Sequence, residues 1–516
     1  MADLDILNKV KFDSNGLVPV ITTDYSSKEV LMLAYFNRQS LEQTMQTGIV
    51  CYYSRSRQQL WVKGATSSNY QKLRSISLDC DADTILLQVD QLGPACHTGV
   101  KSCFFNNLPI NADIANGFAR QKVAVFGSTG SIGKSSMDVL LECKDSFEIV
   151  LLTCESNYQL LLQQASVLRP SFILIEAPLQ PLVRQQIINE ASQFNTKVIF
   201  GSITEPETLL NLKQIDFNTA ILAVPGFRAV RHLAAIFENK NITKICLANK
   251  ESIVCLGDLL FKMAAQRCVE IVPVDSEHNS VFSILGGFKT SGVESLVITA
   301  SGGALLNVLE ADLGKVAVKD VMRHPNWNMG AKITLDSSTL ANKGLELIEA
   351  CRLFNLDESK IEVYVNRTSH LHGGVRFLDG SFVSFTSKPR MQTHIARALF
   401  YPFESGYRQA IGDKSLDLCD QLNFALEPVD YKRFDLLQLA REVSFSVKLS
   451  MAYNMFNELA ASKFFNGDLQ FAAIAPYVRS NIESLKQKLS TADLKSSFET
   501  LEEVFEFYNT LGTFQS

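Results

Sequence analysis

The chain has 516 residues, of which 46% are hydrophobic and 20% charged, and its formal net charge is −5 at pH 7. This length exceeds what one hydrophobic core supports and predicts roughly three or four domains. The mildly acidic balance, without a long basic run, argues against nucleic acid or an anionic membrane as the main partner. No apolar stretch reaches the roughly 18 residues of a membrane span. Residues 1–5 lack the apolar centre of a signal peptide, so we expect a cytoplasmic protein.

Short strands separated by turns are typical of the first part of the chain, as in the β-rich runs 49–53 and 84–89. Turn-forming residues then gather at 106–113, a composition that predicts a linker between domains. We therefore expect a β-rich domain over residues 1–110 and a linker over 111–120.

Three aspartates, Asp79, Asp81 and Asp83, alternate near the end of this first part. On a strand, residues two apart share a face, so the three carboxylates would project together and repel one another. A hard cation such as Mg²⁺ would offset that repulsion. The alternative is a solvated acidic turn with no bound ion.

Three cysteines, Cys80, Cys96 and Cys103, lie close to these aspartates in the sequence. Thiolates favour zinc, and three protein ligands with a water in the fourth position form a catalytic zinc site. A closed structural site with His97 as the fourth ligand is one alternative, and a set of unrelated core cysteines is another.

Several segments of this part together resemble the signature of phosphoribosyl-AMP cyclohydrolases. They include Asp79-Cys80-Asp81-x-Asp83, Cys96-His97-Thr98-Gly99 and Ser102-Cys103-Phe104, with further matches at 32–35, 54–57 and 60–64, so that the similarity covers nearly all of residues 5–108. The resemblance implies that zinc-activated water hydrolyses the bond between N1 and C6 of an adenine ring in histidine biosynthesis. It implies that Cys80, Cys96 and Cys103 bind zinc, and that Asp79, Asp81 and Asp83 bind magnesium. In this family the zinc ligands come from two subunits, which implies a homodimer.

The resemblance leaves the roles of some residues open. His97 is the candidate for proton transfer beside the zinc, with orientation of the site as the simpler role. Arg55, Arg57 and Lys63 could bind the two phosphates of the substrate or be exposed charges. Ser68 stands where the family usually has glycine, and a positive φ angle there would strain this chain.

A buried-strand run at 122–126, a glycine loop and an apolar-periodic segment at 135–143 predict a strand–turn–helix unit. Strand-like and helical segments then alternate to about residue 247, which predicts a doubly wound, mostly parallel sheet. We expect a multi-domain protein: an α/β Rossmann-like nucleotide domain over 121–268, an α+β catalytic domain over 269–405, and a linker with a C-terminal helical domain over 406–516.

The loop after the first strand of this block has the pattern G-x-x-G-x-x-G. Glycines let the backbone approach a pyrophosphate, and the N-terminus of the next helix favours negative charge. A tight structural turn is the alternative. The candidate nucleotide-binding residues are Gly127, Ser128, Thr129, Gly130, Ser131, Ile132 and Gly133.

Asp275 and Glu277 follow a strand-like run two residues apart, and Glu346 is a third acid further along. Three carboxylates suit Mg²⁺ or Mn²⁺ and leave positions for substrate oxygens. A helix cap is the alternative for Asp275 and Glu277, and a packed turn is the alternative for His324. The groups that could bind a phosphate monoester nearby are Ser301, His324, Ser337 and Lys343.

Residues 122 to about 510 resemble 1-deoxy-D-xylulose 5-phosphate reductoisomerases, in segments 127–133, 247–252, 273–279, 324–330 and 342–346. The resemblance implies that NADPH and a divalent metal convert this substrate to 2-C-methyl-D-erythritol 4-phosphate, an isoprenoid precursor. It implies metal ligation by Asp275, Glu277 and Glu346. Lys250 and Glu277 would act on the reacting oxygens, and Ser276 and Asn342 would hold hydroxyls. Ser301, His324, Ser337 and Lys343 would hold the substrate, chiefly its phosphate, while Trp327 lies in a lid segment. Asn157, Asn249, Glu251 and Gly330 would contact the cofactor.

This chain departs from the family at several positions. Glu155-Ser156-Asn157 stands where Gly-Lys-Asn is frequent, and an acid there disfavours a 2′-phosphate. Asn366, Ala304 and the segment Arg390-Met391-Gln392 also differ from the usual residues.

The two resemblances together predict a bifunctional enzyme. The alternatives are one active half with the other as a dimerising or nucleotide-binding module, a nucleotide-binding sensor without chemistry, and a semialdehyde-type dehydrogenase.

Overall fold

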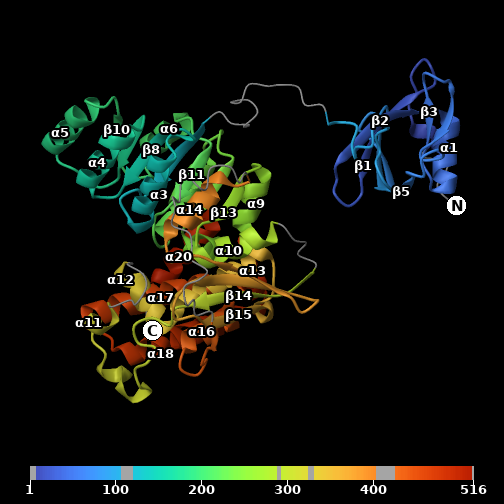
Figure 1. The fold of residues 1–516 in the computed structure, drawn as a ribbon. Coiled ribbons are helices and arrows are strands. Elements are labelled where there is room, and N and C mark those ends of the chain that lie inside the picture. The colour runs from blue at the N-terminus through green and yellow to red at the C-terminus, as the bar shows by residue number, and fades with distance from the viewer. Residues whose placement is uncertain (1–6, 106–119, 287–291, 323–329, 403–424, 514–516) are drawn as a thin grey trace. The chain divides into compact units, whose positions relative to one another are not determined.

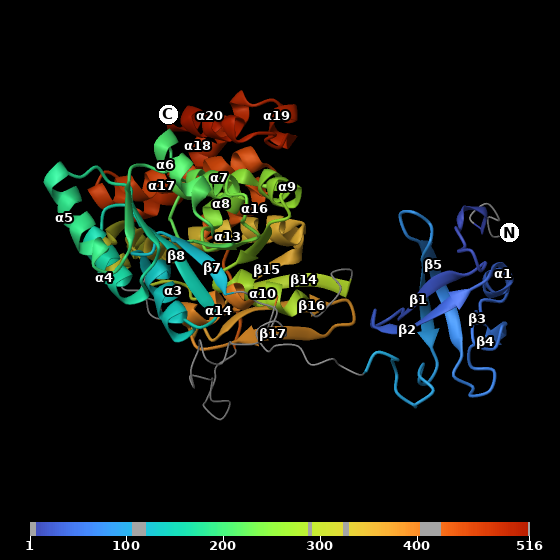
Figure 2. The ribbon, with the colours of Figure 1, turned by 90° about the horizontal axis from the view of Figure 1, so that it is seen from above.

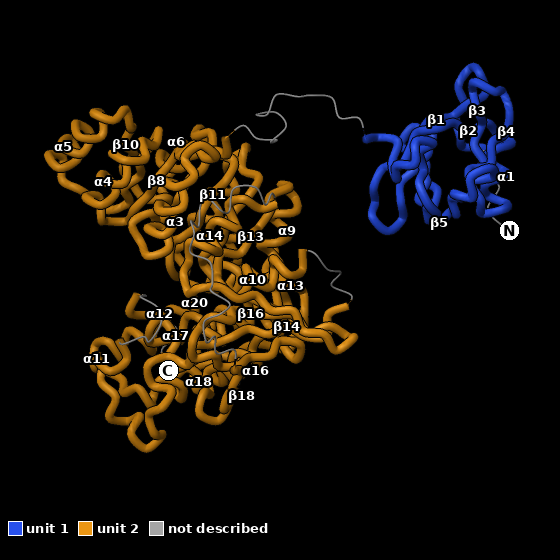
Figure 3. The backbone as a smooth tube through the Cα atoms, viewed as in Figure 1, with its two compact units in different colours: residues 1–118 blue, residues 119–516 orange. Residues whose placement is uncertain are grey.

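The computed structural model describes residues 7–105, 120–286, 292–322, 330–402 and 425–513. The chain forms two compact units, Met1–Phe118 and Ala119–Ser516 (Figure 3). Among the described residues, no helix combines the length and the apolar character needed to cross a membrane.

The first unit is rich in β-structure, as the sequence predicts. Its main sheet has the order β2-β1-β6-β5, in which β1 and β6 run parallel and the other pairs are antiparallel, while β3 and β4 form a separate hairpin. A core that includes Val20, Phe36, Tyr52 and Leu87 holds the unit together. The elements are η1 (Leu7–Lys9), β1 (Val18–Asp24), β2 (Val30–Phe36), α1 (Arg38–Thr47), β3 (Cys51–Ser54), β4 (Gln59–Val62), β5 (Gln71–Leu78) and β6 (Ile85–Gln91).

The aspartate segment is not a strand, so the expected two-residue alternation is wrong there. Strand β5 ends at Leu78 and β6 begins at Ile85, with a turn between them. Asp79 closes this turn, because its Oδ1 accepts hydrogen bonds from the backbone N–H groups of Asp83 and Thr84, both at 3.0 Å. Ala82 has a φ angle of 65°, which a strand does not allow.

The second unit contains a seven-stranded sheet, all of whose pairs are parallel, in the order β10-β9-β8-β7-β11-β12-β13 (Figure 1). The chain runs outward from β7 to β10 and returns to β11, so the direction of winding switches between β7 and β11. Ligands of such sheets bind at the carboxyl ends of the strands near this switch. The strands are β7 (Gln121–Phe126), β8 (Phe147–Cys154), β9 (Phe172–Ile175), β10 (Lys197–Phe200), β11 (Thr219–Leu222), β12 (Lys244–Leu247) and β13 (Glu270–Pro273).

Helices cover both faces of this sheet, which explains why its strands are apolar without alternation. Apolar residues of α3, α4, α5 and α14 pack on one face, and those of α6 to α9 pack on the other (Figure 2). The helices are α3 (Ser131–Glu142), α4 (Tyr158–Leu168), α5 (Pro181–Ser192), α6 (Pro206–Gln214), α7 (Arg228–Phe237), α8 (Lys250–Leu256), α9 (Asp258–Gln266) and α14 (Met391–Phe400).

A second, mixed sheet of five strands has the order β17-β16-β14-β15-β18. Helices α10 and α13 pack against it through a shared core that includes Val281, Leu296, Leu347 and Val375. Its strands are β14 (Val293–Ala300), β15 (Ile361–Val365), β16 (Leu371–Phe377), β17 (Phe382–Thr386) and β18 (Glu427–Pro428), and the surrounding helices are α10 (Ser276–Leu285), η3 (Glu310–Lys315), α11 (Val318–Val321), α12 (Ala331–Thr339), α13 (Ala341–Phe354) and η4 (Glu358–Lys360).

The C-terminal part is helical, and it shares one core with the nucleotide sheet. Met451 and Phe456 of α17 belong to the same buried cluster as Leu222 of β11 and Ile253 of α8. Helix α8 is buried along almost its whole length, with α13 and α17 among its neighbours. The C-terminal helices are α16 (Asp435–Val443), α17 (Val447–Asn466), η5 (Phe471–Ala473), α18 (Ile474–Lys488), α19 (Thr491–Lys495) and α20 (Leu501–Gly512).

Candidate functional site

Three acids that are distant in the sequence meet in the second unit. Asp275 caps α10 just after β13, and Glu277 lies in the first turn of that helix. Glu346 comes from α13. One carboxylate oxygen of each acid lies within 4.8 Å of the others. Their side chains are 11%, 16% and 2% exposed, so the cluster is largely withdrawn from water.

Two lysines balance the charge of these acids. Lys250 Nζ lies 2.8 Å from Asp275 Oδ2 and 2.7 Å from Glu346 Oε1. Lys343 Nζ lies 2.9 Å from Glu277 Oε1 and also contacts Glu346. Asn342 accepts a hydrogen bond from Lys250 at 2.9 Å and donates one to Glu346. The predicted substrate residues Lys250, Asn342 and Lys343 therefore surround the predicted metal ligands.

The two neighbouring acids Asp275 and Glu277 have opposite pKa shifts. Burial raises the pKa of Glu277 to about 7, and the Glu346 carboxylate adds to this rise. Burial also acts to raise the pKa of Asp275, but the Lys250 ammonium and His278 outweigh it and hold that pKa well below its usual range. Three largely buried carboxylates with oxygens at short range are a donor set that suits a hard divalent cation. The residues present therefore fit the metal that the sequence predicts.

His278 and Glu349 support the acid cluster, and the sequence reasoning assigned neither of them a role. His278 Nδ1 lies 3.0 Å from Asp275 Oδ1 and 3.3 Å from Glu349 Oε2, while Nε2 lies 2.8 Å from the Glu346 carbonyl oxygen. Burial lowers the pKa of His278, but Glu349 and Asp275 outweigh it and raise that pKa to about 9. The available signal was helical spacing, because His278 follows Asp275, and Glu349 follows Glu346, by three residues.

A cavity of about 190 Å³ joins the acids to the nucleotide loop. Ser131 and Ile132 at the start of α3 line it together with Asp275, Glu277 and Glu346. The predicted residues Lys250, Ser276, Ser301, Gly330, Ser337, Asn342 and Lys343 line it as well. So do residues that were not predicted from the sequence to lie in the site, among them Thr299, Ser369, His372 and Met391. His324 and Trp327 lie outside the described residues.

The glycine loop is packed closely against the end of β11. Gly127 has a φ angle of 83°, and a Cβ atom there would lie 2.8 Å from the Ala223 carbonyl oxygen. A Cβ atom on Gly133 would lie 2.3 Å from the Gly127 carbonyl oxygen. Ser128 is buried, with its Oγ 2.8 Å from Gln164 Oε1 and 3.2 Å from the Thr153 carbonyl oxygen. Its side chain therefore holds the loop in place and leaves only its backbone for a ligand.

Two of the other predicted cofactor residues are helix caps. Asn249 caps α8 by accepting a hydrogen bond from the Ser252 N–H at 2.8 Å, and its Nδ2 donates to Glu251 at 2.6 Å. Asn157 caps α4, where its Oδ1 accepts from the Leu160 N–H at 3.2 Å. Gly330 precedes α12 and lines the small cavity.

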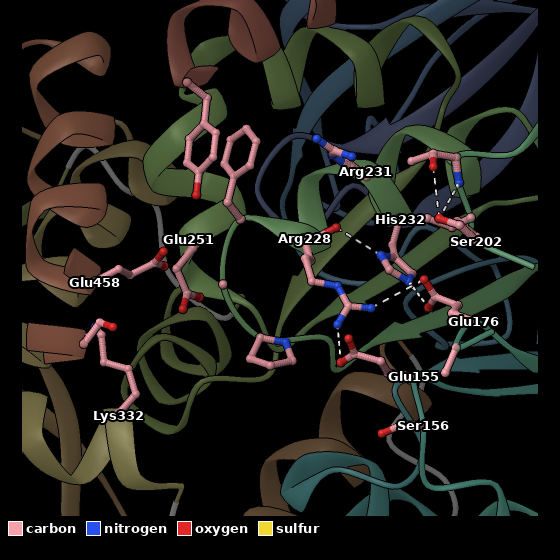
Figure 4. Close-up of a pocket in the computed structure, with 18 of the residues that line it drawn as sticks. Glu155, Ser156, Glu176, Ser202, Arg228, Arg231, His232, Glu251, Lys332 and Glu458 are labelled. Atoms are coloured by element: carbon pink, nitrogen blue, oxygen red, sulfur yellow. Dashed lines mark hydrogen bonds and ion pairs between the residues drawn. The ribbon is translucent and has the colours of Figure 1, made fainter. Parts of the chain in front are cut away.

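A larger cavity of about 1030 Å³ also lies along the carboxyl edge of the parallel sheet (Figure 4). Ile333 lines both cavities. Glu155 after β8, Glu176 after β9 and Gly226 after β11 line the larger one from the sheet, and Glu458 of α17 lines it from the helical part. The two cavities together extend from the acid cluster to the ends of β8 and β9, which is where this type of sheet binds a dinucleotide.

In the first unit, the three predicted magnesium ligands lie together, whereas the three predicted zinc ligands do not. Carboxylate oxygens of Asp79, Asp81 and Asp83 lie within 4.8 Å of one another, although all three residues are exposed. Cys96 and Cys103 interact with each other, and the Thr98 hydroxyl donates to Cys96 Sγ at 3.1 Å. The hydrogen bond from Thr98 lowers the pKa of the Cys96 thiol, whereas burial raises that of Cys103.

Cys80 does not join the other two thiols in a single chain, judged over the described residues. It is exposed beside the aspartate turn. His97 is exposed as well, with its Nδ1 3.9 Å from Cys96 Sγ.

The remaining polar candidates of the first unit differ in exposure. Lys63 is 5% exposed, so the alternative that it is a surface charge is wrong. Burial lowers the pKa of Lys63, and the nearby thiols of Cys103 and Cys96 oppose this shift. Arg55 and Arg57 are exposed, and Arg55 stacks 3.7 Å from the Tyr35 ring centroid.

Ser68 has a φ angle of 61°, in the region that favours glycine. The loop that contains Ser68 therefore carries backbone strain.

Three sequence models of 1-deoxy-D-xylulose 5-phosphate reductoisomerase match successive parts of the chain. The reductoisomerase model matches residues 123–257, and two models of its C-terminal domains match residues 271–354 and 386–510. The model of phosphoribosyl-AMP cyclohydrolase matches residues 32–105.

Individual relatives agree with the reductoisomerase matches. The 1-deoxy-D-xylulose 5-phosphate reductoisomerase of Wolbachia pipientis subsp. Culex pipiens is 35% identical over 367 residues, which are 70% of this chain and 90% of the relative. The enzyme of Pelotomaculum thermopropionicum is 36% identical over 365 residues, which are 70% of this chain and 91% of the relative.

Solved structures show the same likeness. A DOX-P reductoisomerase in complex with NADPH, fosmidomycin and magnesium superposes with a TM-score of 0.67 at 30% identity, over 76% of this chain and 97% of the other. The Zymomonas mobilis reductoisomerase in complex with NADPH superposes with a TM-score of 0.66 at 28% identity, over 77% of this chain and 98% of the other. The chain therefore belongs to the 1-deoxy-D-xylulose 5-phosphate reductoisomerase family and carries a phosphoribosyl-AMP cyclohydrolase-like domain in front of the part that it shares with that family.

Proposed function

We propose that the second unit converts 1-deoxy-D-xylulose 5-phosphate to 2-C-methyl-D-erythritol 4-phosphate, an isoprenoid precursor, with NADPH and Mg²⁺ or Mn²⁺. One observation carries this proposal: the Asp275, Glu277 and Glu346 cluster lines the same cavity as the first turn of α3, next to the glycine loop. A substrate held by the acids would thus lie beside a bound dinucleotide.

The proposed domain bounds are 121–268 for the nucleotide domain, 269–405 for the catalytic domain and 406–516 for the linker and helical domain.

Asp275, Glu277 and Glu346 are the proposed metal ligands. A divalent ion held there would polarise the substrate's carbonyl and lower the pKa of its hydroxyl, and NADPH in the larger cavity would supply the hydride. Asn249, Glu251, Gly330, Asn157 and the loop 127–133 are the proposed cofactor contacts.

The lysines, the serines and Asn342 of the small cavity would bind and orient the substrate. The Lys250 side chain is 13% exposed, and its Nζ donates to Asn342 and Glu346, so it can donate equally to a hydroxyl or carbonyl oxygen that enters beside them. Ser276 and Asn342 would hold the hydroxyls. Ser301, Ser337, Lys343 and the undescribed His324 would hold the phosphate, because hydroxyls and an ammonium are its preferred donors.

The test is oxidation of NADPH by the purified full chain with the xylulose phosphate and Mn²⁺. We expect substrate-dependent loss of NADPH absorbance in the wild type and in Glu190→Gln, an exposed acid of α5. We expect a loss of at least about a hundredfold in Glu277→Gln, because one ligand and one charge leave the acid cluster. Full activity in Glu277→Gln would refute the proposed metal role.

For the first unit we propose hydrolytic opening of the adenine ring of phosphoribosyl-AMP. Cys80, Cys96 and Cys103 would bind zinc, Asp79, Asp81 and Asp83 would bind magnesium, and His97 would transfer the proton. Lys63, buried beside Cys96 and Cys103, adds a cation to the proposed zinc pocket.

A homodimer would supply Cys80 from the partner. An apolar row on the outer sheet face supports pairing of two copies, because Ile21 lies opposite Leu33 on one side and Leu86 on the other. Leu33 and Leu86 are 48% and 39% exposed.

An ultraviolet assay of ring opening tests this second activity. We expect it to be lost in Cys96→Ala and retained in Cys268→Ala, which removes an exposed thiol of the second unit. A wild-type protein with NADPH oxidation but no ring opening would favour the alternative in which the first unit is only a dimerising module.

A further inference from the structure

The residue that follows β8, Glu155, lines the larger cavity and bears on which nucleotide that cavity accepts. This inference rests on the proposed function, because it assumes that the dinucleotide lies along the carboxyl edge of the parallel sheet. Strand β8 is the second strand of the nucleotide fold, and Glu155 comes directly after it. In dinucleotide-binding sheets an acid at this place accepts a hydrogen bond from the ribose 2′-hydroxyl, whereas an arginine nearby accommodates a 2′-phosphate. This cavity contains both kinds of residue, Glu155 and Arg228.

The structure shows how the two residues are arranged. Arg228 is the first residue of α7, after β11, and its guanidinium forms an ion pair with Glu155 (Figure 4). Its other terminal nitrogen lies 3.5 Å from Glu176 Oε2. Glu176 is in turn held by His232 Nε2 at 2.7 Å. The arginine is thus held between two carboxylates.

A second arginine, Arg231, lines the same cavity. Its guanidinium lies 5.8 Å from the centre of the Phe505 ring, on the side of the C-terminal helices. Arg228 is therefore the arginine that faces Glu155.

The charges of Glu155 and Arg228 favour a hydroxyl over a phosphate at the 2′-position of the adenosine ribose. A 2′-phosphate that approaches Arg228 would carry up to two negative charges toward Glu155 and would have to break the existing ion pair. A 2′-hydroxyl needs no such exchange, because it can donate to the second oxygen of Glu155 while Arg228 stays paired. The Glu155 side chain is 64% exposed, so it is accessible to a ribose in the cavity.

We propose that Glu155, positioned by its ion pair with Arg228, reads the 2′-position of the adenosine ribose, so that this reductoisomerase binds NADH at least as tightly as NADPH. Glu155 is the specificity-determining residue and Arg228 is a positioning residue. The proposal distinguishes this chain from its relatives that were solved with NADPH.

The test measures dissociation constants of NADH and NADPH for the full chain by titration calorimetry. ADP-ribose and 2′-phospho-ADP-ribose serve as probes of the adenosine end alone. We expect the wild type to bind NADH as tightly as NADPH or more tightly. We expect Glu155→Gln to shift the ratio of the two constants about tenfold toward NADPH, which corresponds to about 1.4 kcal/mol. Glu148→Gln, an exposed acid on the same strand away from the carboxyl edge, should leave the ratio unchanged.

Two results would overturn the proposal. One is a wild type that binds NADPH about tenfold or more tighter than NADH. The other is an Arg228→Ala variant that loses NADPH affinity selectively, because Arg228 would then be a phosphate ligand and not a partner of Glu155.

These binding constants are independent of turnover, so the proposal and the proposed function can fail separately. A protein that prefers NADH but oxidises neither nucleotide with the xylulose phosphate would support this proposal and refute the proposed function. A protein that turns over and prefers NADPH strongly would do the reverse.

Discussion

Lys343 Nζ lies 2.9 Å from Glu277 Oε1 and also contacts Glu346, so that one ammonium group joins two of the three clustered acids. The lysine side chain is 4% exposed. A buried cation in this place does in the metal-free protein part of what a divalent ion would do, because it offsets repulsion between carboxylates.

Lys343→Met should therefore destabilise the metal-free protein by about 3 kcal/mol, because it leaves two buried carboxylates with less positive charge. Mn²⁺ should then raise the Tm of this variant more than that of the wild type. Differential scanning calorimetry with and without Mn²⁺ measures both effects, and Lys319→Met, an exposed lysine of α11, is the control. An equal Mn²⁺-induced shift in variant and wild type would contradict the role of Lys343 as a balancing cation.

Gly133→Ala should lower the Tm because no space exists for the added methyl group. Its Cβ would lie 2.3 Å from the Gly127 carbonyl oxygen and 2.4 Å from the Ser128 carbonyl carbon, and backbone atoms cannot rotate away. A cost of about 1–3 kcal/mol is typical of such overpacking. Gly130→Ala is the matched control, since its Cβ would lie 3.4 Å from the nearest atom, which is close to an ordinary contact. Equal Tm values for the two variants would show that the loop is not packed as described.

Ser68→Gly should stabilise the first unit by about 1 kcal/mol. Ser68 has a φ angle of 61°, and a residue with a Cβ atom in that region costs about 1–2 kcal/mol relative to glycine. Ser67, which precedes it, is not among the residues with positive φ. Ser67→Gly should therefore have the opposite sign, because it only adds freedom to the unfolded chain. Urea unfolding of the full chain, with a signal that reports on the first unit, gives the free energy of unfolding of that unit in each variant. A lower free energy of unfolding in both variants would contradict the strain at Ser68.

Glu458→Gln should have a pH-dependent effect on stability. Burial raises the pKa of Glu458 to about 7 from its ordinary value of 4.5, with Lys332 opposing the shift. The folded state therefore holds the proton more tightly than the unfolded state, and this contribution to stability is present below pH 4.5 and is lost as the pH rises through 7. Glutamine stays neutral, so the Tm of the variant relative to wild type should increase across this range. A difference that does not change with pH, as expected for the exposed Glu190→Gln, would contradict the shift.

The features that the sequence predicts best are local ones. The glycine loop 127–133 lies between adjacent segments of strand and helix, and the apolar pattern of those segments was enough to predict them. The alternation of strands and helices likewise predicts a multi-domain α/β protein with a parallel sheet, and the solved relatives confirm that coarse class. The family assignments are confirmed by the matches over both parts of the chain.

Features that depend on packing between distant elements could not be predicted in the same way. The pairing of Arg228 with Glu155 requires β8 and β11 to lie on either side of β7, and this strand order is not written in any local pattern. The contact of His278 with Glu349 requires α10 and α13 to pack together. At 79–83 the period of two was real but arose in a turn, because Asp79 binds backbone N–H groups instead of continuing the strand.

Helix α8 begins with Lys250, and α17 of the C-terminal part is one of the elements that surround it. The position of the Lys250 ammonium is therefore set partly by a helix just over two hundred positions further along the chain, whose Met451 and Phe456 belong to the same buried cluster as Ile253 of α8. Truncation before α17 would expose the apolar sides of α8 to water and remove the support of its first turn. A deletion that removes neither the clustered acids nor the glycine loop would thus still impair the candidate active site. The nucleotide domain depends on the C-terminal helices for the position of Lys250.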